Sequence, residues 1–240
     1  MAWWFCLAVV ASLSAAAAAV KTSASACGNH SLALKSDGAV WAWGDDSYGQ
    51  LGLATTGVQW YPVRVDALVG TADIAAGNNH SLAVLADGTV WAWGSNSNGQ
   101  LGDGTTTQRN SPVQVGGLIG VTAVAAGTNC SYALKADGTV WAWGYNNYGQ
   151  LGDGTTTQHA APVQVSGLSN VISVASGIWH VLALKSDGTV WAWGDNGNGQ
   201  LGDGSMTQRG APVRSGNIIG VTSIQAGGRH SVALMADGTV

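Results

Sequence analysis

The residues best suited to chemistry recur at a fixed interval, and that interval argues against an active site. His30, His80, His180 and His230 share one position of a fifty-residue spacing, and Cys130 fills the remaining place. A metal centre or a catalytic group needs several such side chains to converge, whereas equivalent positions of successive repeats stand apart. We therefore expect each histidine to make a structural hydrogen bond to a neighbouring loop.

Aspartate follows the same spacing. Five Asp-Gly pairs recur fifty residues apart, at Asp37, Asp87, Asp137, Asp187 and Asp237. They are expected to be turns, where Asp is favoured for backbone reasons. Three more Asp-Gly pairs lie in long polar segments, at Asp103, Asp153 and Asp203; these could bind calcium, although their spacing differs from an EF-hand. Nucleophile-elbow and P-loop motifs are absent, and no dinucleotide-binding fingerprint follows a predicted strand and precedes a helix, so we expect a non-enzymatic protein without a cofactor.

Comparison of the repeats with one another separates a constant rim from a variable one. If strands alternate in direction, the loop after the first strand and the long loop after the third emerge together, opposite the Asp-Gly turns. This variable rim carries aromatic and arginine side chains, which are typical of binding hot spots. The candidates for partner binding are Tyr48, Trp60, Tyr61, Asn98, Arg109, Tyr145, Tyr148, His159, Trp179, Arg209 and Arg229. Ordinary drift in unconstrained loops would give the same variation, so both interpretations stay open.

The elements that position these residues are predicted to be short strands. Trp-Ala-Trp-Gly starts at Trp41, Trp91, Trp141 and Trp191. A fixed period of this length in strand-rich sequence indicates a β-propeller. The third copy predicts strands at 121–126, 130–136, 139–143 and 162–165. We thus expect an all-β propeller of four-stranded blades, about 4.5 blades in all, with units at 21–70, 71–120, 121–170 and 171–220 and a partial unit at 221–240.

The Asp-Gly turns also predict how each hairpin is paired. A two-residue type I′ turn at Asp137-Gly138 would place Leu134 opposite Trp141 and Ala133 opposite Ala142. One face of every hairpin would then carry large side chains and the other face alanines. Stacking of the large face of one blade on the flat face of the next would bury all eight tryptophans of the repeated tetrapeptide, which we expect to be scaffold residues.

Composition supports this fold class and excludes several functions. The chain of 240 residues contains 36 Gly, 12 Trp and no Glu, and only 9% of its residues are charged, which argues against a helical bundle. The formal net charge is −4, and the absence of a basic run argues against nucleic acid as a partner. The 46% hydrophobic content is enough for a packed core.

Residues 1–20 differ from the rest because they carry no charged side chain. An apolar run followed by small residues predicts a signal peptide, and hence a secreted or cell-surface protein. An uncleaved hydrophobic N-terminal anchor, a misassigned start codon and lipoprotein processing at Cys27 are the alternatives. We expect no other membrane association.

Residues Val140–Gly152 and Ala75–Val84 resemble the signature of the regulator-of-chromosome-condensation repeat, and the resemblance covers residues 21–240. It implies a propeller that usually has seven blades. Because about 4.5 blades are present, we expect either that the natural product continues past Val240 or that two arcs associate through their open blade edges.

That family is functionally mixed. It includes an exchange factor for the GTPase Ran, a plant UV-B photoreceptor, ubiquitin-ligase modules and secreted bacterial propellers, one of them a β-lactamase inhibitor. The even spacing lacks the wedge and basic tail of the exchange factor, and Gly227–Ser231 lacks the tryptophan of the photoreceptor motif. We therefore expect an exported scaffold that binds a protein or a glycan through the variable rim. A secreted enzyme inhibitor is the first alternative, and a guanine-nucleotide-exchange-type regulator is the second.

Overall fold

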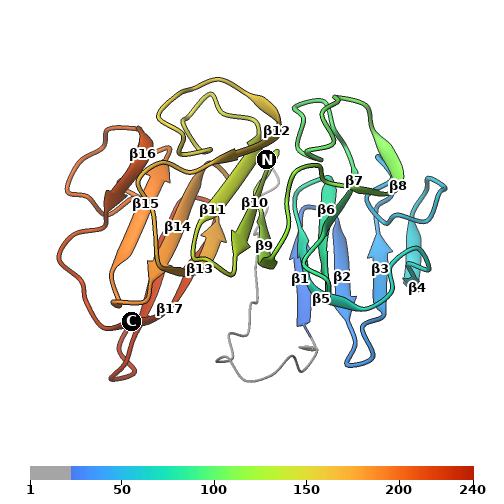
Figure 1. The fold of residues 1–240 in the computed structure, drawn as a ribbon, viewed down its shortest axis with the longest axis horizontal. Coiled ribbons are helices and arrows are strands. Elements are labelled where there is room, and N and C mark those ends of the chain that lie inside the picture. The colour runs from blue at the N-terminus through green and yellow to red at the C-terminus, as the bar shows by residue number, and fades with distance from the viewer. Residues whose placement is uncertain (1–22) are drawn as a thin grey trace.

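The computed structural model describes residues 23–240 as five antiparallel sheets (Figure 1). Blade 1 contains β1 (Ser23–Cys27), β2 (His30–Leu34), β3 (Val40–Gly44) and β4 (Gln59–Arg64). Blade 2 contains β5 (Thr71–Ala76), β6 (His80–Leu85), β7 (Val90–Gly94) and β8 (Arg109–Gln114). Blade 3 contains β9 (Val121–Ala126), β10 (Cys130–Lys135), β11 (Val140–Gly144) and β12 (His159–Gln164). Blade 4 contains β13 (Val171–Ser176), β14 (His180–Lys185), β15 (Val190–Gly194) and β16 (Arg209–Arg214), and blade 5 contains β17 (Val221–Ala226) and β18 (Ser231–Met235).

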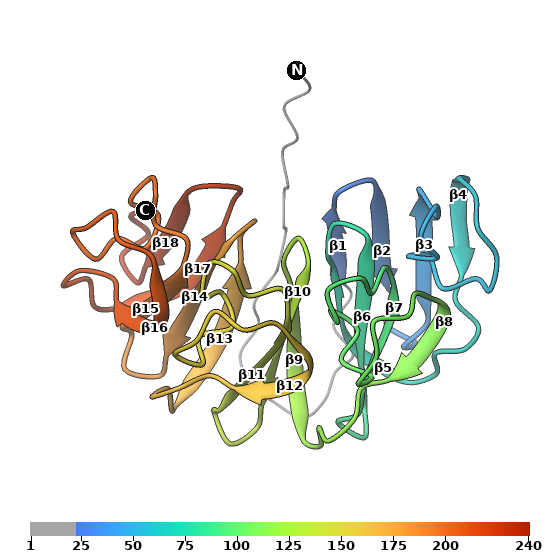
Figure 2. The same cartoon turned by 90° about the horizontal axis from the view of Figure 1, so that it is seen from above.

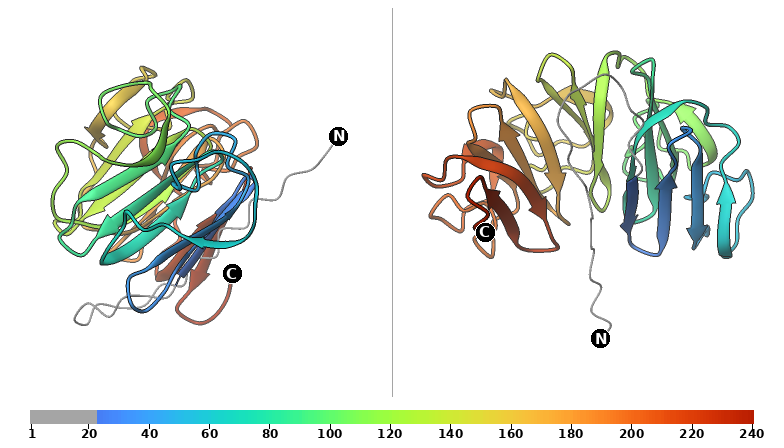
Figure 3. Two further views of the ribbon diagram at one scale, coloured as in Figure 1. Left: turned by 90° about the vertical axis from the view of Figure 1, so that its right-hand side faces the viewer. Right: turned by 90° about the horizontal axis from the view of Figure 1, so that it is seen from below.

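The blades follow one another around an arc (Figure 2). The first strands of successive blades contact one another, so they line the inner side of the arc, and the fourth strands lie on its outer side (Figures 2 and 3). This arrangement confirms the predicted propeller of four-stranded blades. Within residues 23–240 no helix could cross a membrane. The predicted signal peptide lies outside the described residues.

The hairpin register differs by one residue from the prediction. Leu134 pairs with Val140, and Ala133 pairs with Trp141. A type I′ turn needs positive φ at both central residues, but here only Gly138 has it, with φ of 76°. Lys135 N donates to Thr139 O, which closes a three-residue loop in place of the predicted two-residue turn. The fourth strand also begins earlier than predicted, at His159.

The shifted register changes the composition of the two blade faces. On blade 2, Leu82 and Ala92 pair with each other on one face, and Ala83 and Trp91 pair on the other. The prediction of one bulky and one flat face is therefore wrong, since each face carries both large and small side chains. The predicted stacking of blades is confirmed: the aliphatic face of blade 2 packs on Ala133 and Trp143 of blade 3.

The tryptophans of the repeated tetrapeptide divide into two groups. Trp93, Trp143 and Trp193 are fully buried, and their Nε1 atoms donate to the backbone carbonyls of Gln50, Gln100 and Gln150 in the preceding blade, at 2.8–2.9 Å. The prediction that all eight would be buried is wrong for the other five, which are only half-buried, although three of them pack against the core as scaffold residues (Trp91, Trp141 and Trp191); the remaining two are Trp41 and Trp43. Each buried indole thus joins two blades by packing and by one hydrogen bond.

The predicted structural role is confirmed for three of the four repeated histidines, with a strand as the partner in place of a loop; His230, on the incomplete blade 5, is exposed. His30, His80 and His180 each place Nε2 2.8–3.0 Å from a serine hydroxyl of the next blade. Since Ser81 Oγ donates its hydrogen to Gln50 O, His30 Nε2 must donate to Ser81. Burial lowers the pKa of His30 and His180 to about 4 and the pKa of His80 to about 3. The rings are therefore neutral at pH 7.

Candidate functional site

The long loops of the variable rim are closed by their own polar side chains. Arg109 Nη2 lies 2.7 Å from Asp103 Oδ2, while Asp103 Oδ1 accepts from Thr105 N. His159 with Asp153 and Arg209 with Asp203 repeat this pair in blades 3 and 4. The carboxylates are therefore used within the loop, and the described residues contain no group of three or more His, Cys or Asp that could hold a metal ion. The calcium interpretation has no support here.

The remaining candidates are scattered over several blades, with one exception. Trp60 and Tyr61 are 82% and 80% exposed, but they lie on the outer strand β4 and not on a loop. Tyr48 lies on the rim of blade 1, Asn98 on that of blade 2 and Arg229 on that of blade 5. The exception is formed by three aromatic residues from blades 3 and 4.

Tyr145, Tyr148 and Trp179 form an aromatic triad where the rims of blades 3 and 4 meet. The ring centroids of Trp179 lie 5.4 Å from Tyr145 and 5.5 Å from Tyr148, and the two tyrosines are 6.4 Å apart. Sequence repetition defines three equivalent stations at the other blade junctions. These carry Asp45, Tyr48 and Asn79; Ser95, Asn98 and Asn129; and Asp195, Asn198 and Arg229. Of the four stations, only this one is fully aromatic.

Backbone hydrogen bonds hold the triad in place. Tyr145 N donates to Asn129 O at 2.9 Å, and Tyr148 N donates to Gln150 Oε1 at 2.9 Å. Gln150 is itself fixed, because its carbonyl accepts from Trp193 Nε1 at 2.8 Å and from Tyr132 Oη at 2.9 Å. A buried layer therefore supports the exposed rings.

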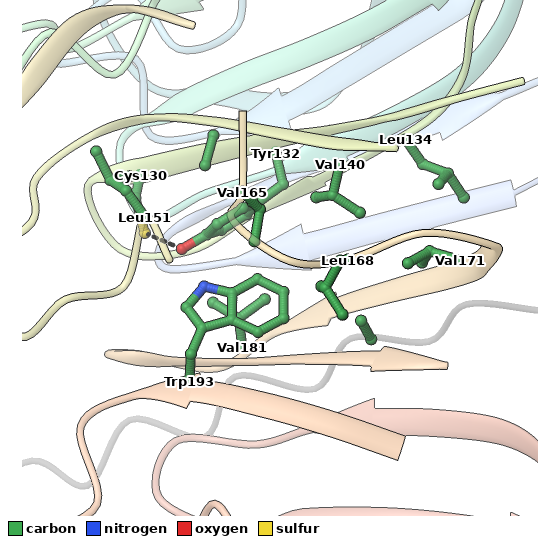
Figure 4. Close-up of a cluster of buried hydrophobic side chains, with 12 residues drawn as sticks. Cys130, Tyr132, Leu134, Val140, Leu151, Val165, Leu168, Val171, Val181 and Trp193 are labelled. Atoms are coloured by element: carbon green, nitrogen blue, oxygen red, sulfur yellow. Dashed lines mark hydrogen bonds between the residues drawn. The ribbon is translucent and has the colours of Figure 1, made fainter. Parts of the chain in front are cut away.

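That buried layer departs from the other junctions in a coordinated way, and three of the residues concerned, Cys130, Tyr132 and Val181, are labelled in Figure 4. Elsewhere a serine donates to the glutamine carbonyl of the preceding blade, as Ser131 does to Gln100 O at 2.7 Å. Blade 4 has Val181 at this position, which cannot donate. Tyr132 from blade 3 reaches the same carbonyl, and its hydroxyl lies 3.1 Å from Cys130 Sγ, where other blades have a histidine. Burial raises the pKa of Cys130 to about 11, so the thiol stays protonated.

Replacing Tyr132 by Phe should lower the free energy of unfolding by about 1–3 kcal/mol, because it removes a donor from the buried carbonyl of Gln150. Adding Val181→Ser should recover most of this loss, since the new hydroxyl supplies the donor that the other junctions use. Urea unfolding of the two single variants and the double variant measures the coupling. Equal costs of Tyr132→Phe with and without Val181→Ser would contradict the shared role.

The presence of a tyrosine at position 145 leaves a buried side chain beneath it without a hydrogen-bond partner. In the other complete blades the buried glutamine donates from Nε2 to the residue equivalent to Tyr145: Gln50 to Asp45 at 3.1 Å, Gln100 to Ser95 at 3.4 Å and Gln200 to Asp195 at 2.8 Å. A tyrosine offers no acceptor there, and Gln150 Nε2 is buried without a partner. A buried donor without an acceptor lowers the free energy of unfolding by about 1–3 kcal/mol. Buried polar groups are normally hydrogen-bonded, and an exception that lowers stability is expected at functional sites.

Gln150 was missed by the sequence analysis, as were the supporting residues Asn129 and Tyr132. The signal was present in the repeat comparison, because Tyr145 stands where the other blades have Asp or Ser. Its meaning depends on knowing that a buried glutamine donates to that position, and only the structure shows this.

Comparisons with known proteins agree with this architecture. A family model of the RCC1-like domain matches residues 8–240. The crystal structure of human WBSCR16 is 29% identical, with a TM-score of 0.79 over 87% of this chain and 56% of that one. Yeast RCC1 (Prp20) is 28% identical, with a TM-score of 0.75 over 88% of this chain and 53% of that one. The chain thus spans little more than half the length of these solved structures.

The family model covers nearly the whole chain, and the blades have the order and packing of the solved propellers. The predicted resemblance to this repeat family is confirmed. We conclude that the chain belongs to the RCC1-like domain family of β-propellers.

Proposed function

We propose that this chain is a non-enzymatic scaffold that binds a protein partner through the aromatic triad. The observation that carries the proposal is the unpartnered Gln150 Nε2 beneath Tyr145. Three equivalent stations avoid this cost with an Asp or a Ser, so placing an aromatic ring here lowers stability and calls for another benefit. Aromatic rings in a supported, partly exposed cluster are typical of hot spots in protein interfaces.

A protein partner is favoured by the relatives. Yeast RCC1 (Prp20) has been crystallised with Kap60 bound to it, so a protein that contains a propeller of this family can have a protein partner. The identity of the partner does not transfer, because the chain spans about half of that protein. Export to the cell surface or medium is part of the proposal and is supported by the apolar, uncharged composition of residues 1–20.

The substitution Tyr145→Asp separates binding from stability. The new carboxylate can accept from Gln150 Nε2, as Asp195 accepts from Gln200, so the free energy of unfolding should stay equal or rise by about 1 kcal/mol. Capture of a partner should fall at least tenfold, as expected for loss of a hot-spot residue worth about 2 kcal/mol. Urea unfolding measures the first effect. Quantitative mass spectrometry of proteins captured from secreted and cell-surface fractions measures the second.

The matched control is Ser95→Asp, which makes the equivalent change in blade 2, where no triad exists. This variant should retain every captured protein. If Tyr145→Asp captures the same proteins in the same amounts as the unmodified chain, the triad is not the binding site and the proposal fails.

A further inference from the structure

The chemistry of the triad and its surroundings indicates what it binds. We infer that the triad receives a cationic side chain, a lysine or an arginine, from the protein partner. This inference rests on the proposed function, since it specifies the ligand of the same site. Aromatic faces attract cations located within about 6 Å of the ring centroid.

The geometry allows one cation to reach all three rings. The three centroid separations of 5.4, 5.5 and 6.4 Å define a small triangle. A charge about 3 Å above the centre of that triangle would lie roughly 4.5 Å from each centroid, inside the range in which aromatic faces attract cations. The rings are tilted by 39–57° to one another, so they do not stack into a flat surface. Tyr148 is 37% exposed, which leaves the triad open to a ligand.

A carboxylate borders the triad on the blade 4 side. Asp195 N donates to Trp179 O at 2.9 Å, so the two residues are neighbours across the hairpin. The negative charge of Asp195 also acts on His180, the residue after Trp179, by favouring its protonated form. Asp195 accepts hydrogen bonds from Gly197 N and Gln200 Nε2, both of which are neutral. In the described residues Asp195 forms no ion pair.

Most of the positive charges in the described residues are already paired with an aspartate. Arg109 and Arg209 form ion pairs with the aspartates of their own loops. The lysines of the described residues lie beside the Asp-Gly turns at the opposite rim: Lys35, Lys135 and Lys185. Arg229, on blade 5, is the one arginine of this rim for which the described residues show no ion pair. Charge complementarity therefore favours a basic ligand over an acidic one.

Selection from a random peptide library displayed on phage tests the inference. Clones are selected on the full chain and counter-selected on the Tyr145→Asp variant, which keeps those that depend on the triad. We expect Lys and Arg to be enriched at least threefold in these clones. A synthetic peptide of the most enriched sequence should lose at least fivefold in affinity when its basic residue is changed to Gln.

Asp195→Ser provides the test on the protein side, because blade 2 carries Ser95 at this position and the glutamine keeps an acceptor. The peptide should bind this variant at least threefold more weakly, with a smaller dependence on salt. Asp45→Ser makes the same change of charge in blade 1 and should bind the peptide as the unmodified chain does.

The outcomes are distinguishable. Triad-dependent clones without enrichment of basic residues would overturn the cationic ligand and leave the proposed binding site intact. A selection that yields no triad-dependent clone would count against both. Equal weakening by Asp195→Ser and Asp45→Ser would show a general charge effect and would also overturn the inference.

Discussion

Replacing Trp143 by Ala is expected to lower the free energy of unfolding by about 3–5 kcal/mol. The indole is fully buried between blades 2 and 3, where it packs with Leu101 and Val115. The substitution removes this contact area, leaves a cavity and deprives Gln100 O of the donor that lies 2.9 Å away. Urea or thermal unfolding followed by circular dichroism measures the loss.

Trp141 is the matched control, because it lies on the same strand two residues away and is only half-buried. Its replacement by Ala should cost about 1 kcal/mol, since partial exposure leaves less apolar area to lose. Equal costs at the two positions would contradict the division of the tryptophans into a buried group and a half-buried group.

Acidification from pH 6.5 to pH 4 is expected to destabilise the fold steeply. His30, His80 and His180 keep pKa values of about 4, 3 and 4 when folded, because burial disfavours the charged ring. The unfolded chain takes up protons at these residues near pH 6.5. In this window the unfolded state binds more protons than the folded state. The free energy of unfolding therefore decreases by about 1.4 kcal/mol per histidine for each unit by which the pH is lowered.

Asp46 opposes this trend. Burial raises its pKa from 3.8 to about 6, so the folded state takes up this proton before the unfolded state does. The net difference of about two protons gives a slope of about 3 kcal/mol per pH unit near pH 5. Urea unfolding at pH 7, 6 and 5 measures this slope.

Asp46→Asn supplies an internal check of the pH dependence. The equivalent residue of blades 2, 3 and 4 is asparagine, and Asp46 Oδ2 is buried without a partner. The variant should be more stable at pH 7 and should show a steeper slope near pH 5, because the opposing proton is gone. Unchanged stability of the natural chain from pH 7 to pH 5 would show that the histidines are not held neutral.

Much of the fold could be predicted from the sequence, because an exact fifty-residue period needs no structure to be seen. The strands at 121–126 and 130–136 match β9 and β10 within one residue. The register of the hairpin was wrong for a local reason. Asp137-Gly138 has the composition of a type I′ turn, but only Gly138 takes a positive φ, and the loop is one residue longer.

The site could be predicted only in part. Tyr145, Tyr148 and Trp179 were among the rim candidates, but without the structure the exchange of Asp or Ser for Tyr145 gave no reason to prefer them to Arg109 or Trp60. The structure shows that Arg109 is bound to Asp103 and that the three rings meet across a blade boundary. Contacts between residues of different blades depend on how the blades pack, and a repeat alignment does not contain that information.

The contacts between blades also govern how such an array can change in length. Each buried histidine bonds to a serine 51 residues later, in the next unit. A unit of fifty residues therefore carries the serine for the junction before it and the histidine for the junction after it. Duplication or loss of one unit would therefore recreate a working junction at its ends. The exception is the boundary between blades 3 and 4, where Val181 stands in place of the serine and Tyr132 of the preceding unit supplies the hydroxyl instead. A gene rearrangement that places the unit of Val181 after a unit without Tyr132 leaves the glutamine carbonyl with the indole as its one remaining donor, which makes that boundary the least tolerant place for the repeat number to change.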